Sequence, residues 1–386
     1  MTNPADAVTT ARAVAGRLRK DAVERQHANQ PPLSEIQMLR ESGLLAVDPD
    51  DHRTTHAVTR LVSAGDASIG HLLGYHYLHL WRASLYDNDE LARSLRQDVV
   101  ADQLFVAAVS NPRDTVTATE IGDGLSVSGR GAFATGCAVA DRLFVSATRA
   151  DRGARLVVVA RRGAGGISHP SDWDNLGQRL TASGSIVFQD VRIDPVDVLG
   201  TFPVDEDESS PRWLRLSLVP LAFQAVLTQV LVGIVEGALA EAAQYTRESS
   251  RPWPASGLEN AVDDPHILAG YGDLVATLRA ARLIAGEATR AFGEADAAGP
   301  ALTAAERGRA GLTISAAKVV SSRTATEVTS RIFDLTGARA TARSSGLDRF
   351  WRDARTLTLH DPLVYKAQEL GTSLLTGKVP PITAYS

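Results

Sequence analysis

The chain has 386 residues, of which 44% are hydrophobic and 22% charged, which is enough apolar sequence for a large core and two or three structural units. Its formal net charge is −5, and its Lys and Arg residues are scattered, which argues against nucleic acid as the main partner. The single cysteine, Cys137, cannot form an internal disulfide, and the polar N-terminus lacks a secretion signal. We therefore expect a globular protein of the reducing cytoplasm, with Cys137 either a reactive thiol or a small buried residue.

The character of the sequence changes twice along the chain. Residues 1–101 carry apolar positions at helical spacing, and residues 102–203 carry short alternating or β-rich runs separated by Gly, Asp and Asn. Residues 204–386 begin with an acidic segment, after which the predicted helices cover 212–249, 265–295, 303–337 and 361–377. The sequence therefore predicts an α+β fold with an N-terminal helical domain, a middle antiparallel sheet or small barrel, and a C-terminal helical domain.

One apolar stretch, 216–239, is long enough to raise the question of a membrane span. Gln224, Thr228 and Gln229 interrupt it, Pro220 lies inside it, and no basic flank follows. A helix that is apolar all round is also what the centre of a helical bundle requires. We expect a buried helix and no membrane association.

The usual nucleotide and metal motifs are missing. The glycine-rich segment 129–136 has its third glycine too late for a dinucleotide fingerprint and lacks the Lys of a phosphate loop, so a turn between strands explains it equally well. His71, Tyr75 and His79 follow one another at four-residue spacing on one helix face, but no carboxylate lies in register with them. We therefore predict no metal site.

The segment Phe350-Trp-Arg-Asp-Ala-Arg-Thr-Leu-Thr-Leu-His-Asp-Pro362 is the most informative part of the chain. It resembles the flavin-site segment of acyl-CoA dehydrogenases, in which an Arg-Asp-Ala-Arg run precedes a Tyr-Glu-Gly triplet that supplies the catalytic base of one branch. Here Leu359-His360-Asp361-Pro362 replaces that triplet. An imidazole in place of the carboxylate favours oxygen activation over dehydrogenation. Asp361 followed by Pro362 is typical of a helix start, so we assign Asp361 as an N-cap.

Six segments in the same order extend this resemblance over about 300 residues. They are similar to the flavin-dependent monooxygenases with the acyl-CoA dehydrogenase fold, and most closely to the dibenzothiophene monooxygenase branch, which oxidises sulfur heteroaromatics with flavin reduced by a separate enzyme. The resemblance implies an N-terminal helical domain, a middle β-barrel, a C-terminal four-helix bundle and a homotetramer. The matching segments are 67–76, 131–136, 172–184, 245–253, 346–352 and 358–362.

The same resemblance implies roles for individual residues. His360 would donate a hydrogen bond or a proton to the hydroperoxide that the reduced flavin forms with oxygen. Thr135, with Gly136, would meet the flavin edge through a hydroxyl in place of the family's Ser, and it is assigned both a catalytic and a cofactor-binding role. Trp173 and Ser183 would cover the ring system and offer polar groups to it.

Further residues are assigned to the phosphate and the substrate. Arg251 resembles the phosphate-binding arginine that a neighbouring subunit contributes, and Arg352 lies in a matching cofactor segment. His71, Tyr75 and Ala108 are assigned to the substrate side, with Tyr75 also a candidate for contact with the peroxide. Each has a structural alternative, such as a packed core residue or a surface arginine.

The chain also departs from the family pattern. Ala108 stands where the sulfur-oxidising relatives have an Asn, and the Pro-x-x-Tyr-Gly-Gly segment that follows Gly-Leu-Leu in those relatives is missing after Leu45. Dibenzothiophene is therefore a doubtful substrate. Asp334 and Ala338 replace the Gln and a Gly that hold the adenylate half of FAD in the dehydrogenases. Because an acid facing a diphosphate is unfavourable, we expect FMN rather than FAD.

The sequence therefore predicts a two-component monooxygenase that takes FMNH2 from a separate NAD(P)H:flavin reductase. It would oxygenate a small apolar aromatic or a sulfur- or nitrogen-containing molecule. Two alternatives stay open, an FAD-dependent acyl-CoA dehydrogenase with a displaced base and a non-catalytic flavin-binding homologue.

Overall fold

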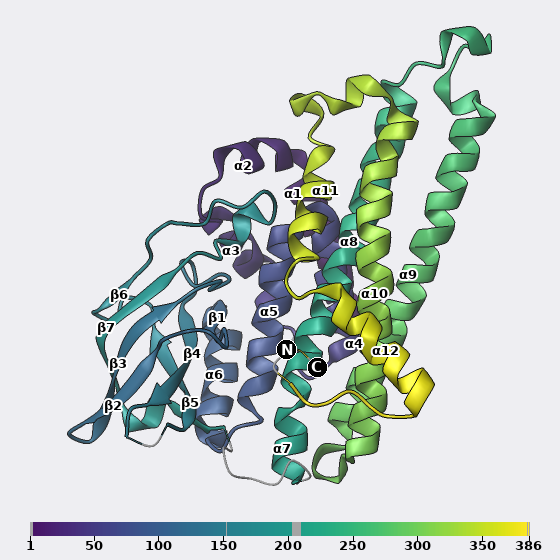
Figure 1. Cartoon of the computed structure of the whole chain (residues 1–386). Coiled ribbons are helices and arrows are strands. Elements are labelled where there is room, and N and C mark those ends of the chain that lie inside the picture. Colours follow the sequence, from purple (N-terminus) through teal and green to yellow (C-terminus); the bar gives the residue numbers. More distant parts are fainter. Residues whose placement is uncertain (1–2, 152, 203–209, 384, 386) are drawn as a thin grey trace.

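The computed structural model describes residues 3–151, 153–202, 210–383 and 385. Helices form the first part of the chain (Figure 1). Asp66 is the N-cap of α5, because its Oδ1 accepts hydrogen bonds from the backbone N–H groups of Ser68 and Ile69 at 3.0 and 3.3 Å. The helices in this part are α1 (Pro4–Lys20), α2 (Ala22–Ala28), α3 (Leu33–Ser42), α4 (His52–Gly65), α5 (Ala67–Ala83) and α6 (Asp89–Asp102).

The middle of the chain folds as one eight-stranded sheet. Its hydrogen-bonded order is β6-β7-β3-β2-β4-β5-β8, and β1 pairs with β4 beside this path. The β1–β4 and β2–β4 pairs are parallel and the other pairs antiparallel. Among the described residues this path does not return from β8 to β6. The strands are β1 (Val106–Val109), β2 (Thr117–Ile121), β3 (Gly124–Gly131), β4 (Arg142–Arg149), β5 (Arg155–Arg161), β6 (Ile167–Ser168), β7 (Ile186–Ile193) and β8 (Val198–Thr201).

Long helices return after the sheet and stand side by side on the opposite side of the molecule (Figure 1). The connection between α8 and α9, residues 249–264, lies at the end of this bundle that is remote from the sheet. The helices are α7 (Pro211–Leu216), α8 (Leu218–Glu248), α9 (Pro265–Ala297), α10 (Ala304–Thr336), α11 (Asp348–Leu357) and α12 (Leu363–Thr376).

The apolar stretch that raised the question of a membrane span is the centre of this bundle. By length and composition the segment Pro211–Glu248 could cross a membrane, but 89% of its most apolar window is buried inside the protein. Helix α8 packs against α4, α5, α9 and α10. Gly233 and Gly237 allow the close approach of α4, because a Cβ at either position would lie 2.4 Å from the backbone oxygen of Arg60 or Ala64.

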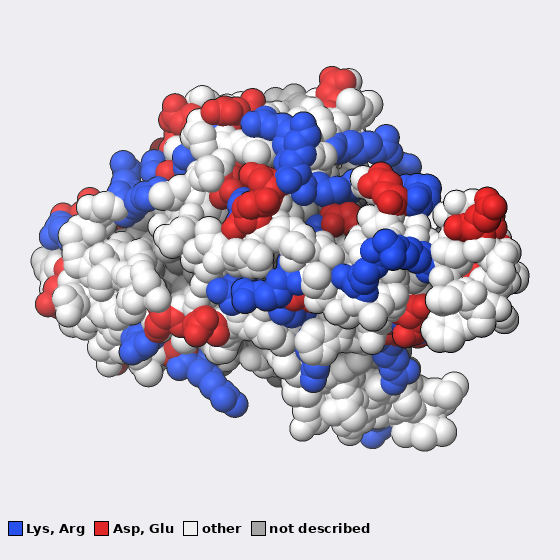
Figure 2. Space-filling view, turned by 90° about the horizontal axis from the view of Figure 1, so that it is seen from above, with Lys and Arg blue, Asp and Glu red and all other residues white. Residues whose placement is uncertain are grey.

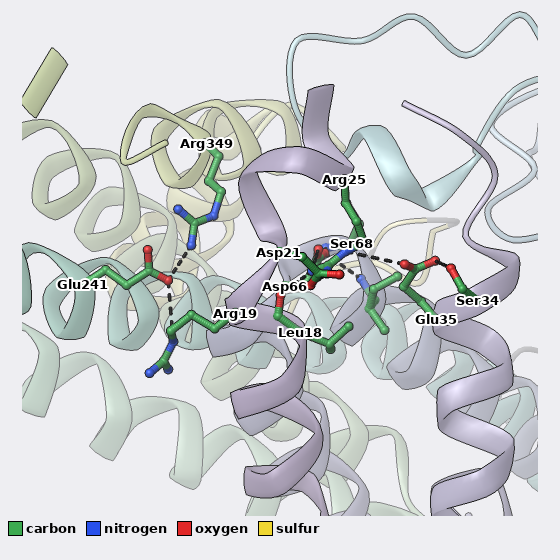
Figure 3. Close-up of polar contacts among 11 residues, drawn as sticks. Leu18, Arg19, Asp21, Arg25, Ser34, Glu35, Asp66, Ser68, Glu241 and Arg349 are labelled. Carbon is green, nitrogen blue, oxygen red and sulfur yellow. Dashed lines mark hydrogen bonds and ion pairs between the residues drawn. The ribbon is translucent and has the colours of Figure 1, made fainter. Parts of the chain in front are cut away.

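Helix α5 lies between the sheet and α8, and every one of its residues is buried. Its N-terminus is tied to the N-terminal helices, since Arg25 Nη2 lies 3.1 Å from Asp66 Oδ2 and Arg25 Nε lies 3.6 Å from Glu35 Oε1 (Figure 3). In the same view Glu241 of α8 pairs with Arg349 of α11. These contacts fix the two helices, α5 and α11, that carry several of the predicted site residues.

The predicted domain divisions, 1–101, 102–203 and 204–386, remain a prediction. The last N-terminal helix ends at Asp102 and the first strand begins at Val106, and Thr201 ends the last strand before Pro211 begins α7. Figure 2 shows Lys and Arg interspersed with Asp and Glu over the face seen from above, without a broad patch of one sign.

Candidate active site

A cavity of about 1120 Å³ lies where the sheet, α5 and the start of α8 meet the end of α11 and the C-terminal tail. Its walls combine aromatic and aliphatic side chains with a small number of polar groups, which is the usual character of a cofactor or substrate site. Phe133 and Leu359 line it and are 67% and 63% exposed, so they lie at its mouth. The volume is slightly above the usual range for small-molecule sites and is sufficient for a flat cofactor together with a small substrate.

A chain of hydroxyl groups forms one wall of the cavity. Thr135 Oγ1 and Ser183 Oγ lie 2.8 Å apart, Ser183 Oγ donates to Thr181 Oγ1 at 2.7 Å, and Thr181 Oγ1 donates to the backbone oxygen of Gln178 at 2.8 Å. The two segments that carry them are joined by backbone bonds, from Ala134 N to Gly184 O and from Gly136 N to Thr181 O. The hydroxyls are thus held at fixed positions, and because each of their protons is donated along the chain, they present acceptor lone pairs to a planar ring edge.

Asp353 of α11 holds the turn that carries Gln178. Its Oδ1 accepts the backbone N–H of Gln178 at 2.5 Å, and Gln178 has the left-handed φ of 54°. Burial raises the pKa of Asp353 to about 7. The hydrogen bond from the Gln178 backbone N–H acts in the opposite direction, but its effect on the pKa is smaller. The backbone oxygen of Gln178 also accepts from Trp173 Nε1 at 2.9 Å. The Arg-Asp-Ala-Arg run, residues 352–355, therefore contributes to the site through Asp353, which fixes the turn at Gln178.

Helix α5 presents polar aromatic side chains to the cavity from one face. His71 Nδ1 lies 3.1 Å from Gln178 Oε1, so it is the donor and Nε2 is left as an acceptor without a partner. The His71 and Tyr75 rings meet edge to face with centroids 4.3 Å apart, and the Tyr75 hydroxyl has no hydrogen-bond partner among the described residues. Burial lowers the pKa of His71 to about 3 and raises the pKa of Tyr75. At neutral pH His71 is therefore uncharged and Tyr75 keeps its proton.

His360 lines the cavity beside the C-terminal tail. Its Nδ1 is 3.1 Å from Asp361 Oδ1, and its ring meets that of Tyr385 edge to face at 6.3 Å. Asp361 also accepts from Gln224 Nε2 at 3.2 Å and lies 3.7 Å from Lys318 Nζ. Burial acts to raise the pKa of Asp361, but the hydrogen bond from His360 and the charge of Lys318 hold it well below its usual range.

The expected role of Asp361 as a helix N-cap was wrong. Helix α12 begins at Leu363, its N-cap position is Pro362, and no side chain caps it. The Asp361 carboxylate faces inward because Lys318 is fully buried and requires a counter-charge. Asp361 is therefore placed to orient His360 and to keep its Nε2 available.

The structure brings most of the predicted residues together, and the ones that line the cavity are His71, Tyr75, Ala108, Thr135, Trp173, Ser183 and His360. Gly136 lies behind the wall at φ +75°, where a Cβ would lie 2.9 Å from Leu72 Cδ2. Arg352 lies outside the wall and donates to the backbone oxygen of Leu176 at 3.1 Å. Arg251 is exposed, in the remote α8–α9 connection, and does not reach the cavity of its own chain.

Several residues were missed by sequence reasoning. Gln178 and Asp353 lay inside segments that had been matched, but nothing in their spacing showed that they would bond across 175 residues. Lys318 and Arg82 each lie within a helical pattern and received no role, although they are only 0% and 2% exposed. Their burial could have been recognised from the sequence, because each is a charged residue at a position where the helical periodicity predicts the core face.

Two further predictions can be placed. Cys137 is buried and donates to the backbone oxygen of Ala108 at 3.4 Å, and burial raises the pKa of its thiol, which is the state of an unreactive core residue. Among residues 3–151, 153–202, 210–383 and 385, no three His, Cys, Asp or Glu side chains gather closely enough to hold a metal ion.

The polar groups at this wall fit an isoalloxazine ring. The buried Gln178 Nε2, His71 Nε2 and Tyr75 hydroxyl lack partners in the described chain, and such groups are costly unless a ligand satisfies them. A flavin ring carries carbonyl and nitrogen groups along one edge and an apolar dimethylbenzene part. It can therefore meet both the hydroxyl chain and the aromatic wall at Trp173.

Comparison with known proteins agrees with this fit. Residues 225–364 match the family model described as acyl-CoA dehydrogenase, C-terminal domain. The probable FMNH2-dependent monooxygenase SfnC of Pseudomonas putida is 37% identical over 395 residues, which cover 100% of this chain and 98% of that protein. The likeness therefore extends over the whole length of both proteins.

Two solved structures share the fold in full. The methanesulfinate monooxygenase MsuC of Pseudomonas fluorescens is 36% identical, with a TM-score of 0.91 and 100% of both chains covered. The dibenzothiophene monooxygenase TdsC of Paenibacillus sp. A11-2 is 33% identical, and its complex with FMN and indole gives a TM-score of 0.91 over 98% of this chain and 100% of that one. The chain therefore belongs to the FMNH2-dependent monooxygenases that have the acyl-CoA dehydrogenase fold.

Proposed function

We propose that this chain is the oxygenase of a two-component system, that it takes reduced FMN from a separate NAD(P)H:flavin reductase, and that it inserts one atom of O2 into a small aromatic or heteroatom-containing molecule. The observation that carries the proposal is one cavity in which the Thr135–Ser183–Thr181 hydroxyls, the His71–Tyr75 pair and His360 converge. Reduced FMN would supply two electrons and two protons, so that one atom of O2 enters the substrate and the other leaves as water.

Thr135, Ser183 and Trp173 are the residues that would hold the ring of FMN. The hydroxyl chain offers hydrogen bonds to its polar edge, and Trp173 is fixed by its bond to Gln178 so that its indole can cover the ring. Because Asp353 fixes the backbone of Gln178, the ring site and the His71 side chain are positioned together. The site is therefore formed before the cofactor arrives, which reduces the ordering cost of binding.

His360 and Tyr75 are the residues placed to hold or move a proton. When His360 Nδ1–H donates to Asp361, Nε2 remains available to take up a proton and pass it on. Tyr75 keeps its hydroxyl proton, since burial raises its pKa, and can donate without ionising. The aromatic contacts of Tyr75 with Phe223, at 5.0 Å between centroids, keep that side of the cavity apolar and exclude water.

Dehydrogenation of an acyl-CoA is less compatible with these contacts. That reaction needs a carboxylate base, whereas His360 stands in its place and Asp361 is the adjacent carboxylate. Its pKa is held well below its usual range by His360 and Lys318 against the effect of burial, so it is a weak base. Its oxygen is already bonded to His360 and Gln224. A non-catalytic role is also less compatible, because the cavity is open and its unsatisfied polar groups point to a ligand.

A homotetramer in the cytoplasm is part of the proposal. Helices α9 and α12 expose large apolar side chains, among them Leu283, Leu374 and Leu375 at 77%, 86% and 84%. Such exposed residues favour burial against other copies. Arg251, in the connection between α8 and α9, does not line the cavity of its own chain, so a phosphate that it binds would belong to a neighbouring copy. FMN is preferred to FAD, as the replacement of the family Gln by Asp334 indicates.

The proposal is tested by mixing the protein and anaerobically reduced FMN with ¹⁸O2, in the presence of dibenzothiophene or indole. We expect ¹⁸O in the product and, without substrate, slower release of H2O2 than from free reduced FMN. If H2O2 forms at the rate of the free flavin and no product carries ¹⁸O, the proposal is wrong.

A further inference from the structure

Arg82, near the C-terminal end of α5, is a buried cation that lines the cavity and has no counter-ion among the residues that the structure describes. It is 2% exposed, and its Nε and Nη2 atoms have no hydrogen-bond partner. It forms no salt bridge with any carboxylate of the described residues, and its guanidinium lies 5.6 Å from the centroid of the Phe144 ring. A guanidinium in this state is costly to keep, and an anion with oxygen acceptors is its natural complement.

The sheet adds polar groups to the same end of the cavity. Ala108, Phe144 and Ser146 lie on one face of β1 and β4, since Ala108 pairs with Phe144 and side chains alternate along a strand. Arg155 of β5 shares that face, because Ser146 pairs with Val157, two residues further on. Ser146 and Arg155 both line the cavity. The wall opposite Arg82 therefore offers a hydroxyl donor and a second cation.

This end of the cavity is separate from the predicted ring site. Tyr75 and Arg82 are seven residues apart on α5, which is about 10 Å along the axis at the rise of a helix. Both side chains tilt toward the helix N-terminus, so this separation is kept between them. The separation leaves room for an aromatic ring with its substituents between an anion held by Arg82 and a group that lies beside Tyr75.

We propose that Arg82, with Arg155 and Ser146, binds an anionic oxygen group of the substrate, a carboxylate or a sulfonate, at the end of the cavity away from the flavin ring. This inference rests on the proposed function and names its substrate class: an aromatic acid that carries its oxidisable sulfur or nitrogen about one ring away from the acid group. For a thioether, the sulfur lone pair takes one oxygen atom of O2 and becomes a sulfoxide, reduced FMN is oxidised, and the second oxygen atom leaves as water.

The experiment measures ligand binding to the FMN-free protein by titration calorimetry, so that it does not depend on turnover. The probes are 4-(methylthio)benzoate, the corresponding benzenesulfonate and the neutral 4-(methylthio)benzamide. We expect both anions to bind at least tenfold more tightly than the amide. The ratio of the dissociation constants of the two anions shows whether the site prefers a planar carboxylate or a tetrahedral sulfonate.

The variants are Arg82→Met, Arg82→Lys and Arg155→Gln, with Arg93→Met as a control that removes an exposed arginine of α6. We expect Arg82→Met to abolish the preference for anions, Arg82→Lys to keep part of it, Arg155→Gln to weaken it and Arg93→Met to leave it unchanged. Arg82→Met should also raise the Tm of the ligand-free protein, because it removes an uncompensated buried charge, whereas loss of a structural arginine would lower it.

Two results would overturn the inference. One is equal binding of the amide and the anions to the parent protein. The other is competition between FMN and the benzoate together with weaker FMN binding by Arg82→Met, which would assign Arg82 to the cofactor phosphate. Because these results concern binding, they are distinguishable from a failure of the proposed function, which would appear as the absence of ¹⁸O from every product.

Discussion

Lys318 Nζ lies 3.7 Å from Asp361 Oδ1, and the two side chains are 0% and 5% exposed. This buried pair connects α10 to the segment between α11 and α12, and through Asp361 it reaches His360. The chemistry of the site and the stability of the bundle therefore depend on the same contact.

Asp361→Asn is expected to lower the free energy of unfolding by about 3–5 kcal/mol, because it leaves Lys318 buried without a counter-charge. Lys318→Met combined with Asp361→Asn should recover most of that loss. Urea denaturation of the FMN-free variants measures both values. Additive losses in the double variant would show that the pair is not coupled. Because the folded-state pKa of Asp361 is lowered, its stabilisation is present above about pH 4 and is lost as the pH falls further.

His360→Ala is expected to lower product formation about 10²-fold and to raise the share of O2 that is released as H2O2, because the group that passes the proton is lost. FMN binding should remain within twofold of the parent. The measurement is the ratio of H2O2 to oxygenated product, with His27→Ala, at an exposed position, as the control. An unchanged ratio would exclude His360 from the chemistry.

Thr135→Val is expected to weaken FMN binding about five- to tenfold, since one hydrogen bond contributes about 1 kcal/mol and the bond to Ser183 is also lost. Thr135→Ser keeps the hydroxyl and should bind FMN as the parent does. Fluorescence quenching of FMN measures both. Weaker binding by Thr135→Ser with unchanged binding by Thr135→Val would show that the threonine methyl group, and not the hydroxyl, is what the site needs.

Asp353→Asn is expected to raise the free energy of unfolding at pH 8 and to change it little at pH 4. Burial raises the pKa of Asp353 to about 7, so the folded state holds a proton that the unfolded state has already lost. The contribution of Asp353 to stability therefore falls as the pH rises from about 4 to about 7. The Asn oxygen can still accept the backbone N–H of Gln178. A variant less stable than the parent at pH 8 would show that the ionised carboxylate is the stabilising form.

Arg251→Ala is expected to weaken FMN binding about ten- to hundredfold, through loss of a charge-assisted contact worth ~1.5–3 kcal/mol. If the contact is made between copies, an oligomer that mixes Arg251→Ala chains with Thr135→Val chains should regain normal FMN affinity at some of its sites. These are the sites in which an Arg251→Ala chain supplies Thr135 and a Thr135→Val chain supplies Arg251. Arg247→Ala, an exposed neighbour at the end of α8, is the matched control. Binding as tight as in the parent would remove Arg251 from the cofactor site.

The order of helices, strands and long helices could be predicted from the sequence because it depends on local periodicity. The spacing of apolar residues is a property of neighbours along the chain, and it agrees with α5, the strand region and α8–α10 as the structure has them. The family membership could be predicted for a related reason. Short segments such as 131–136 and 358–362 resemble the corresponding segments of the family, and such a resemblance can be recognised without the fold.

The network behind the site depended on contacts that no local pattern contains. Gln178 bonds to Asp353 and to His71 across long separations, and Asp361 turns away from the start of α12 to pair with Lys318. A capping interaction is worth about 1 kcal/mol, whereas a buried lysine without a counter-charge costs several, so the tertiary contact overrides the local preference. The sequence by itself determined the element order and pointed to seven of the residues that line the cavity. Only the tertiary structure decided how those residues are charged and oriented, because burial and distant partners set both.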